Sequence, residues 1–512
     1  MAVSNLVCRN PFLSRTLCTR NGAKIINPNL CFLASVLTTA IAVVFFDKNL
    51  AEICLRGCSL LLWRQFSAKR NMMQTLQQLN DGLLLGYQRV SIAEQLTQFP
   101  TKLFELADTL EVLDLSNNQL SSLPDNFADL HQLKILFVSN NLFEHLPAVL
   151  GQCPKLEMIG FKANQIRTVP EASIPKQTRW LILTDNQIEQ LPDSLGQCHR
   201  LEKLALAGNR LTALPNSMAN CHQLALIRLS ANQLTALPYW LFELPNLAWL
   251  AFAGNAFSHV EHCDNTRVPV VPLTQFTLGQ LLGQGASGLI YQATHHDEHS
   301  DEASFSCQTD VAIKLFKGMV TSDGYPADEL DCCLTAGEHP NLINVVAQIN
   351  QPEQLGLVMQ LIPPSYGNLG LPPSLQTCSR DTFEAQTVFT WARITYIASQ
   401  MADILAHLHQ NGISHGDIYA HNIMINTQDS VLFGDFGAAS NLKQFTPQHL
   451  QLMQAIEVRA FGYLVDDMLN LIDNPNTPQA TMLRQLVQDC LQHSASTRPS
   501  FKALLPRLAS IV

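Results

Sequence analysis

Apolar and polar residues recur with a fixed spacing in the first half of the chain. Leu110, Leu113 and Leu115 precede Asn118, and the same Leu-x-x-Leu-x-Leu-x-x-Asn arrangement returns every 22 or 23 residues. The asparagines that end successive units are Asn118, Asn141, Asn164, Asn186, Asn209, Asn232 and Asn255. Alternating apolar positions predict one short strand in each unit. Because so short a strand cannot bury its apolar side alone, neighbouring units must stack and share a core.

This pattern resembles the leucine-rich repeat, whose units contain roughly 20–29 residues. The resemblance implies a solenoid over residues 72–264, with residues 75–109 as its N-terminal cap. Each asparagine is expected to turn inward and bond to backbone groups at the end of its strand, which would otherwise be buried without partners.

The pattern changes after a proline-spaced linker at residues 265–275. Residues 276–282 alternate as a strand, which leads into Gly283, Gly285 and Gly288 and resumes at once. Glycines with this spacing that opened a helix would indicate dinucleotide binding, whereas a loop between two strands favours a cover for ATP phosphates. Further strands are expected at residues 311–314 and 357–361, and a long helix at 391–409.

Three oxygen-bearing side chains follow that helix. Asp417 is followed by Asn422 and then by Asp435, at the start of Asp-Phe-Gly. Amide and carboxylate oxygens are ligands that Mg²⁺ prefers, with substrate phosphates completing its coordination. A carboxylate free of metal can accept a proton from an attacking hydroxyl. The order of the glycine loop, Val-Ala-Ile-Lys at 311–314, His-Gly-Asp at 415–417 and Asp-Phe-Gly resembles the protein kinases, and residues 75–512 together resemble bacterial leucine-rich-repeat protein kinases.

The resemblance implies a role for each of these residues. Asp417 would be the catalytic base, and Asn422 and Asp435 would hold Mg²⁺. Lys314 would pair with the ATP phosphates and with a helix glutamate, for which Glu329 is the candidate and Asp328 a rival. The residues expected around ATP are Gly283, Gly285, Ala286, Ser287, Gly288, Ile290, Lys314, Met359 and Leu361. The implied fold class is multidomain, an α/β repeat solenoid followed by a bilobal, α+β kinase-like domain at residues 276–512.

The implied function is ATP-dependent transfer of a γ-phosphoryl group to a protein hydroxyl, with serine or threonine as the expected acceptor. One alternative is a pseudokinase scaffold that binds nucleotide and docks partners through the repeats. Another is a kinase that acts on a small molecule. The intact set of Lys314, Asp417, Asn422 and Asp435 argues against the scaffold, and the repeats favour a macromolecular partner.

Several positions depart from the family pattern. Gly416 stands where the family usually has arginine, and Tyr419 replaces a lysine, which removes one positive charge near the γ-phosphate. Only 22 residues lead from Asp435 to Glu457, which resembles the acidic start of the large-lobe helix, and no Ala-Pro-Glu motif lies between them. Arg498 resembles the arginine that usually pairs with the glutamate of that motif, so its partner stays open. We therefore expect slow turnover.

The strand positions that face the concave side of the solenoid carry a column of apolar side chains. Contiguous exposed apolar surface tends to mark interaction sites, and tryptophan is prominent among interface anchors. We expect a protein substrate or partner to bind there, on Phe137, Met158, Trp180, Leu226 and Trp249. The alternative is that the kinase-like domain, or the N-terminus of the chain, covers this face.

The net charge and the cysteine pattern limit the kinds of protein that this chain can be. A net charge of −10 argues against a nucleic-acid surface, and the 14 cysteines show no Cys-x-x-Cys pair, so we expect reduced thiols and a cytoplasmic location. Residues 30–46 form an apolar run at the short end of the roughly 17–25 residues that span a bilayer. Residues 1–71 are therefore either a membrane anchor or a non-native extension before a true start at Met72 or Met73.

Overall fold

The computed structural model describes residues 73–258, 268–285, 287–296, 310–318, 320–321 and 323–511. The description below concerns the unit Gln74–Val512. The expected apolar segment at 30–46 and the rest of residues 1–71 lie outside the described residues. Among the residues that are described, no helix combines the length and apolar character needed to cross a membrane.

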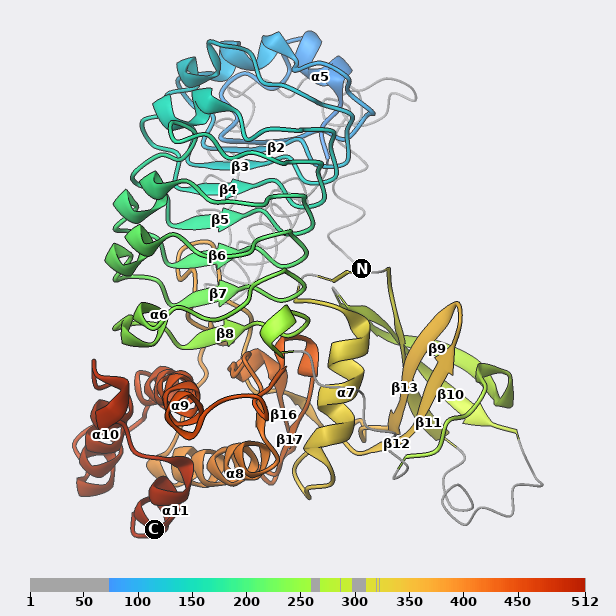
Figure 1. Ribbon diagram of the computed structural model, residues 1–512, viewed down its shortest axis with the longest axis vertical. Coiled ribbons are helices and arrows are strands. Elements are labelled where there is room, and N and C mark those ends of the chain that lie inside the picture. Colours follow the sequence, from blue (N-terminus) through green and yellow to red (C-terminus); the bar gives the residue numbers. More distant parts are fainter. Residues whose placement is uncertain are drawn as a thin grey trace, which may run out of the picture. The chain divides into compact units, whose positions relative to one another are not determined.

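The first part of this unit is a stack of short parallel strands, one from each repeat (Figure 1). A helix, α5 (Leu76–Asn80), caps its N-terminal end, and Thr75 and Gln78 close a reciprocal capping box at the start of this helix. The strands pair in chain order as one sheet: β1 (Arg89–Ser91), β2 (Val112–Asp114), β3 (Ile135–Phe137), β4 (Met158–Gly160), β5 (Trp180–Ile182), β6 (Lys203–Ala205), β7 (Leu226–Arg228) and β8 (Trp249–Ala251).

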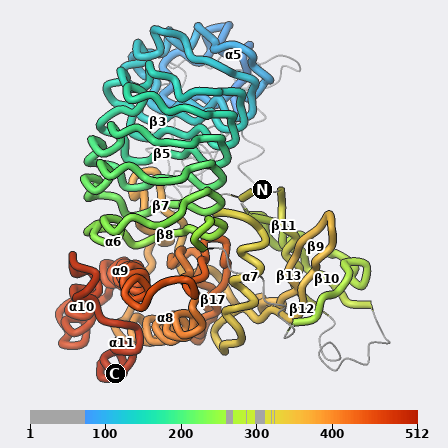
Figure 2. Tube along the Cα trace, viewed as in Figure 1, coloured from blue at the N-terminus to red at the C-terminus, as the bar shows by residue number. Residues whose placement is uncertain are grey.

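Short 3₁₀ turns and one helix lead the chain back to the next strand. They are η1 (Thr101–Leu106), η2 (Phe127–Asp129), η3 (Ala148–Gln152), η4 (Asp193–Gln197), η5 (Asn216–Asn220), α6 (Trp240–Glu243) and η6 (Ala256–Ser258). The tube in Figure 2 shows the resulting coil from blue to green. The predicted solenoid of repeats is confirmed.

The repeat asparagines form a buried ladder. Asn186 Nδ2 donates to the carbonyls of Phe161 (2.9 Å) and Leu183 (3.0 Å), and its Oδ1 accepts from the Ile166 amide (3.0 Å). The other six asparagines of the series repeat this arrangement. Each side chain thus satisfies backbone groups of two successive repeats, as predicted, and ties the repeats together.

The small lobe of the kinase-like domain is an antiparallel sheet with strand order β12-β13-β11-β10-β9. Its elements are η7 (Leu273–Gln275), β9 (Phe276–Gln284), β10 (Gly288–His295), β11 (Asp310–Phe316), α7 (Pro326–Ala336), β12 (Val345–Gln351) and β13 (Gln354–Gln360). The glycine loop joins β9 directly to β10, as expected of strands that continue on both sides of it. The end of the linker pairs with β12, because Val271 donates its amide to the Gln348 carbonyl (2.9 Å).

The large lobe is mainly helical. Its helices are α8 (Trp391–Gln410), α9 (Pro447–Leu469), α10 (Pro478–Cys490) and α11 (Phe501–Ala509). Its short strands and turns are β14 (Gly367–Asn368), β15 (Ile413–Ser414), η8 (Ala420–Asn422), β16 (Ile423–Ile425), β17 (Val431–Phe433), η9 (Phe436–Ala438), β18 (Ser440–Asn441) and η10 (Ala495–Thr497). The helix predicted at 391–409 and the predicted fold class are confirmed.

The repeats and the large lobe share their apolar cores. Leu442, Met453 and Ile456 of the large lobe join the core of the repeats. In the other direction, Leu226 and Trp249 of the repeats join the core of the large lobe. Strand β8 and helix α6 lie beside α9, which Figure 1 shows at the lower end of the solenoid.

Candidate phosphoryl-transfer site

A cavity of about 1250 Å³ lies between the small and large lobes. It is lined by most of the residues that the sequence singled out: Gly283, Gly285, Ser287, Gly288, Ile290, Lys314, Glu329, Met359, Leu361, Asp417 and Asp435. Ala286, also expected there, lies outside the described residues. The structure thus brings segments from both lobes to one space, while the roles given to them stay predictions.

Lys314 connects the two lobes within this cavity. Strand β11 holds it between two apolar neighbours, and its Nζ donates to Glu329 of α7 and to Asp435 Oδ1 (3.2 Å). Its side chain is 8% exposed and that of Glu329 is 3% exposed. Burial alone would lower the pKa of Lys314, but the carboxylates of Asp435 and Glu329 outweigh burial and hold it above its ordinary value. The ammonium is therefore fixed in its charged form.

Burial has the opposite effect on the glutamate of this pair. It raises the pKa of Glu329, and the Lys314 ammonium offsets part of the shift. The rival for this position, Asp328, lies instead against Gly254 of the last repeat. The structure therefore pairs Lys314 with Glu329.

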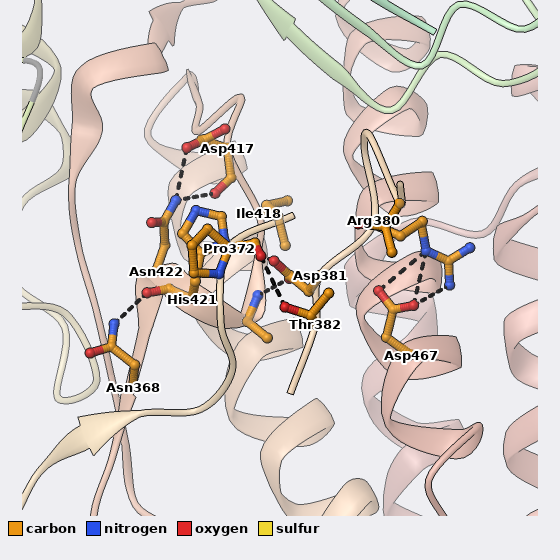
Figure 3. A network of polar contacts seen from close by, with 12 residues as sticks. Asn368, Pro372, Arg380, Asp381, Thr382, Asp417, Ile418, His421, Asn422 and Asp467 are labelled. Carbon is orange, nitrogen blue, oxygen red and sulfur yellow. Dashed lines mark hydrogen bonds and ion pairs between the residues drawn. The ribbon is translucent and has the colours of Figure 1, made fainter. Parts of the chain in front are cut away.

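The loop at residues 415–422, called the catalytic loop below, places Asp417 next to Asn422. The Asn422 Nδ2 donates to the Asp417 carbonyl (3.0 Å) and to its Oδ2 (2.8 Å), as Figure 3 shows. Asp435, which precedes η9, has a left-handed backbone with φ of +61°. A non-glycine residue rarely adopts this conformation, which the surrounding structure must hold in place.

His415 packs in the interior of the large lobe. Its ring stacks on Phe433 with centroids 4.2 Å apart, and its Nε2 lies 3.0 Å from the Gly434 carbonyl. It is fully buried, and burial lowers the pKa of its imidazole. The ring therefore packs beneath the Asp-Phe-Gly segment and does not face the cavity.

The Asp381 carboxylate also bonds to the catalytic loop. Asp381 accepts from the Ala420 amide and pairs with His421 Nδ1 (2.7 Å), while Asn368 donates to the His421 carbonyl (Figure 3). The segment that carries Asp381 is fixed in turn by Arg380, which forms an ion pair with Asp467 of α9 (2.6 Å). Sequence reasoning missed Asp381, because its irregular segment carries no periodic signal.

Asp435 lines the cavity, whereas Asn422, the other residue predicted to hold Mg²⁺, bonds to Asp417 and is not one of the lining residues. Asn422 uses its amide nitrogen on Asp417, which leaves its oxygen for a ligand. The Asp435 side chain lines the cavity and is 60% exposed. Within the described ranges, no cluster of three or more His, Cys, Asp or Glu side chains could hold a metal by itself. This donor set suits Mg²⁺, which takes one or two protein ligands and completes its coordination with phosphates and water.

The glycine at 416 is required by its surroundings. Its φ is +72°, and a Cβ atom there would lie 2.5 Å from the Ala438 carbonyl oxygen and 3.0 Å from that of Leu250 in β8. Its amide donates to Glu457 (2.8 Å), which also pairs with His409 (2.7 Å). An arginine side chain therefore has no room at this position, and part of the space is taken by the repeats.

The segment after Asp-Phe-Gly is short in the structure as well. Strand β18 pairs with β15, and α9 begins soon afterwards at Pro447, so Glu457 lies inside this helix and not at its start. Arg498, whose partner was open, donates to the carbonyls of Ala455 (2.8 Å), Gln492 (2.9 Å) and His493 (3.1 Å). It holds the end of the lobe together through backbone groups.

Two of the five residues predicted to bind a partner are buried against the catalytic loop, which corrects their assignment. Trp249 stacks on Tyr419 (4.5 Å between centroids) and donates its Nε1 to the Ile418 carbonyl (3.0 Å). Leu226 joins the same core. For these two residues, the alternative of a face covered by the kinase-like domain holds.

The other three residues of the predicted partner site differ in exposure. Met158 is also buried, at 3% exposed. Phe137 and Trp180 remain half-buried, and Lys203 places its Nζ 4.7 Å above the Trp180 ring. Of the five predicted residues, only Phe137 and Trp180 are therefore partly exposed on the concave side.

Arg228 of β7 is the functional residue that sequence reasoning missed most clearly. It donates to Asp417 Oδ1, to the Gly416 carbonyl (3.0 Å) and to Asp323 Oδ1 (2.9 Å). A signal was present: Arg228 is the only basic residue in the fifth position of the aligned strands, where the others are Asp114, Phe137, Gly160, Ile182, Ala205 and Ala251.

Comparison with known proteins agrees with this geometry. The profile of the Protein kinase domain matches residues 276–455, and that of the Leucine rich repeat matches residues 93–143, 108–166, 176–234 and 199–257. An inactive tyrosine-protein kinase of Caenorhabditis elegans is 30% identical over 32% of this chain and 17% of its own length. A probable serine/threonine-protein kinase of Dictyostelium discoideum is 26% identical over 35% of this chain and 32% of its own.

A mitogen-activated protein kinase kinase kinase of Arabidopsis thaliana is 24% identical over 35% of this chain and 26% of its own length. The chain thus spans a third or less of the length of these three relatives. They come from a nematode, a slime mould and a plant, so nothing in these matches supports the expected bacterial type. The chain contains a protein kinase domain, preceded by leucine-rich repeats.

Proposed function

We propose that this protein is an active protein kinase, which transfers the γ-phosphoryl group of ATP to a serine or threonine hydroxyl of a protein. The observation that carries the proposal is the position of Lys314, which contacts Glu329 and Asp435 at once in the cavity that Asp417 also lines. A kinase domain implies ATP binding. Since the reaction needs ATP, we also propose a cytoplasmic location.

The residues have separate tasks in this reaction. The acceptor hydroxyl gives its proton to the Asp417 carboxylate as its oxygen bonds to the γ-phosphorus, and the bond from that phosphorus to the β–γ bridging oxygen breaks to leave ADP. Lys314, held charged by Glu329, stabilises the α- and β-phosphates. When bound, Mg²⁺ at Asn422 and Asp435 would neutralise charge on the phosphate oxygens. The protein thus acts mainly by positioning and by charge stabilisation.

A nucleotide-binding scaffold without transfer is a second candidate, and one observation favours it. The repeats contact the catalytic loop through Arg228 and Trp249, and Arg228 donates to the proposed base itself. Phe137 and Trp180 would then be the part of the concave face that recruits a protein.

Incubation of the full-length chain with γ-labelled ATP and Mg²⁺ separates the two candidates. Wild type is compared with Asp417→Asn, and nucleotide binding is measured on both proteins. Label incorporated by wild type and lost in the variant supports the kinase. Binding without incorporation in either protein supports the scaffold.

A further inference from the structure

We infer that Arg228 of the repeats is a positioning residue of the phosphoryl-transfer site, which it completes from outside the kinase domain. This inference rests on the proposed function, because it assigns Arg228 an effect on the base of that reaction. The residue lies in the seventh repeat strand, 189 positions before Asp417 in the chain. Its guanidinium nevertheless contacts the catalytic loop directly.

The contacts of Arg228 use each of its nitrogens for a different group. Nε donates to Asp323, Nη1 to the Gly416 carbonyl and Nη2 to Asp417. Its side chain is 7% exposed. A rigid, planar fork with three partners fixes both the orientation of the carboxylate and the backbone beside it, which a flexible ammonium would do less well.

The catalytic loop, residues 415–422, contains no lysine or arginine of its own. Gly416 leaves no room for a side chain, since part of the space beside it belongs to Leu250 of the repeats. Tyr419, the other position at which the sequence departs from the family, is stacked on Trp249 and carries no positive charge. The guanidinium that meets Asp417 therefore comes from the repeats.

Charge balance supports the same assignment. Five carboxylates line the cavity, those of Asp323, Glu329, Glu338, Asp417 and Asp435, and all but that of Glu338 pair with Lys314 or Arg228. Lys314 pairs with Glu329 and Asp435, while Arg228 pairs with Asp323 and Asp417. Without Arg228, two neighbouring carboxylates would repel each other in a largely buried site.

The contacts of Arg228 still leave Asp417 able to accept a proton from the acceptor hydroxyl. Arg228 occupies Oδ1 and Asn422 occupies Oδ2, and each carboxylate oxygen accepts more than one hydrogen bond. The Asp417 side chain is 24% exposed, so an acceptor hydroxyl can approach it. The two donors hold the carboxylate from two directions and leave the cavity side open.

The last two repeats are fixed firmly enough to serve this purpose. Trp249 is 2% exposed between the catalytic loop and α9, and its Nε1 bonds to the Ile418 carbonyl. The Phe252 amide donates to Ser440 Oγ (3.0 Å) in β18. These contacts bind the last repeat both to the loop that Arg228 meets and to β18.

The test compares Arg228→Met and Arg228→Lys with wild type and with Arg210→Met, a control at an exposed repeat arginine. If Arg228→Met folds poorly, the double variant Arg228→Met with Asp323→Asn is measured instead, because it removes one negative charge together with the positive one. We expect Arg228→Met to lower kcat by about 100-fold with little change in the KM for ATP, because the base is displaced and the nucleotide is not. Arg228→Lys should recover part of the rate, and Arg210→Met should match wild type.

A chemical readout separates positioning from a purely structural role. Guanidinium ion at low millimolar concentration should raise the rate of Arg228→Ala several-fold and leave wild type unchanged. Unchanged kcat in Arg228→Met, or a rate above wild type, would overturn the inference while the kinase assignment stands. If wild type transfers no phosphate, the proposed function fails by itself, and hydrogen exchange then decides: faster exchange of residues 415–422 in Arg228→Met supports positioning, and unchanged exchange rejects it.

Discussion

Trp249 of the last described repeat strand lies flat against Tyr419 of the catalytic loop, with ring centroids 4.5 Å apart and planes 4° from parallel. Both side chains are buried. One of the two residues by which the loop departs from the kinase pattern, Tyr419, is thus a residue on which the repeats dock. This contact places Trp249 of the repeats and Tyr419 of the large lobe in one apolar core.

Replacing Trp249 by alanine should destabilise the protein strongly. The change removes a stacked ring and leaves a cavity in a shared core, which costs about 3–5 kcal/mol in the free energy of unfolding. Trp180→Ala, at a half-buried position on the same face, should cost clearly less. Urea denaturation followed by circular dichroism measures both. Equal losses in the two variants would show that the docking contact adds no stability.

A methyl group at Gly416 should be tolerated far less well than at a free glycine. Gly416→Ala combines a positive φ with a Cβ placed 2.5 Å from a carbonyl oxygen. Gly86→Ala has a φ of +80° and nothing within 4 Å, so it isolates the backbone cost of roughly 1–2 kcal/mol. Thermal unfolding should show a larger drop for Gly416→Ala. Equal drops would contradict the close approach of the Ala438 and Leu250 carbonyls to Gly416.

Loss of the Lys314 ammonium should abolish most of the transfer activity. Lys314→Met removes the cation shared by Glu329 and Asp435, and we expect a fall in kcat/KM of at least about 100-fold. Lys102→Met, which breaks an exposed ion pair with Glu105, serves as the control and should match wild type. Label transfer from ATP measures both variants. A Lys314→Met enzyme with normal activity would remove the basis of the proposed site.

Acid should destabilise the fold through His415. Its folded-state pKa is lowered by burial, so below its ordinary pKa of about 6.5 the unfolded chain binds a proton that the folded chain does not. The free energy of unfolding then falls as the pH is lowered, by at most about 1.4 kcal/mol per pH unit, until the folded-state pKa is passed. This contribution is fully present above pH 6.5.

His415→Leu should flatten that dependence relative to wild type. Denaturant unfolding at several pH values between 5 and 8 measures both. Parallel curves for wild type and His415→Leu would mean that other groups cause any acid sensitivity.

Local spacing was enough to predict the central part of the site. Asp417, Asn422 and Asp435 lie within one short stretch, and their geometry follows from strands and turns that the same stretch encodes. Lys314 needed only the alternation of β11 and the family resemblance. The asparagine ladder was predictable for the same reason, because each asparagine and the backbone groups to which it bonds belong to the same short repeating pattern.

Contacts between distant segments could not be predicted in this way. His421 meets Asp381 over 40 positions, and Asp417 meets Arg228 over 189. Periodicity identified the concave face that carries Trp249, but it does not say what covers that face. Only the packing of the large lobe decides that Trp249 is buried while Trp180 stays half-exposed.

The most direct test of the central claim is a single-turnover time course of phosphate transfer from γ-labelled ATP, made with the full-length chain in wild-type and Asp417→Asn forms at equal nucleotide occupancy. The account predicts label on protein hydroxyls in wild type and a rate at least about 100-fold lower in the variant. Full nucleotide occupancy without labelled protein in wild type, or equal rates in the two forms, would contradict it.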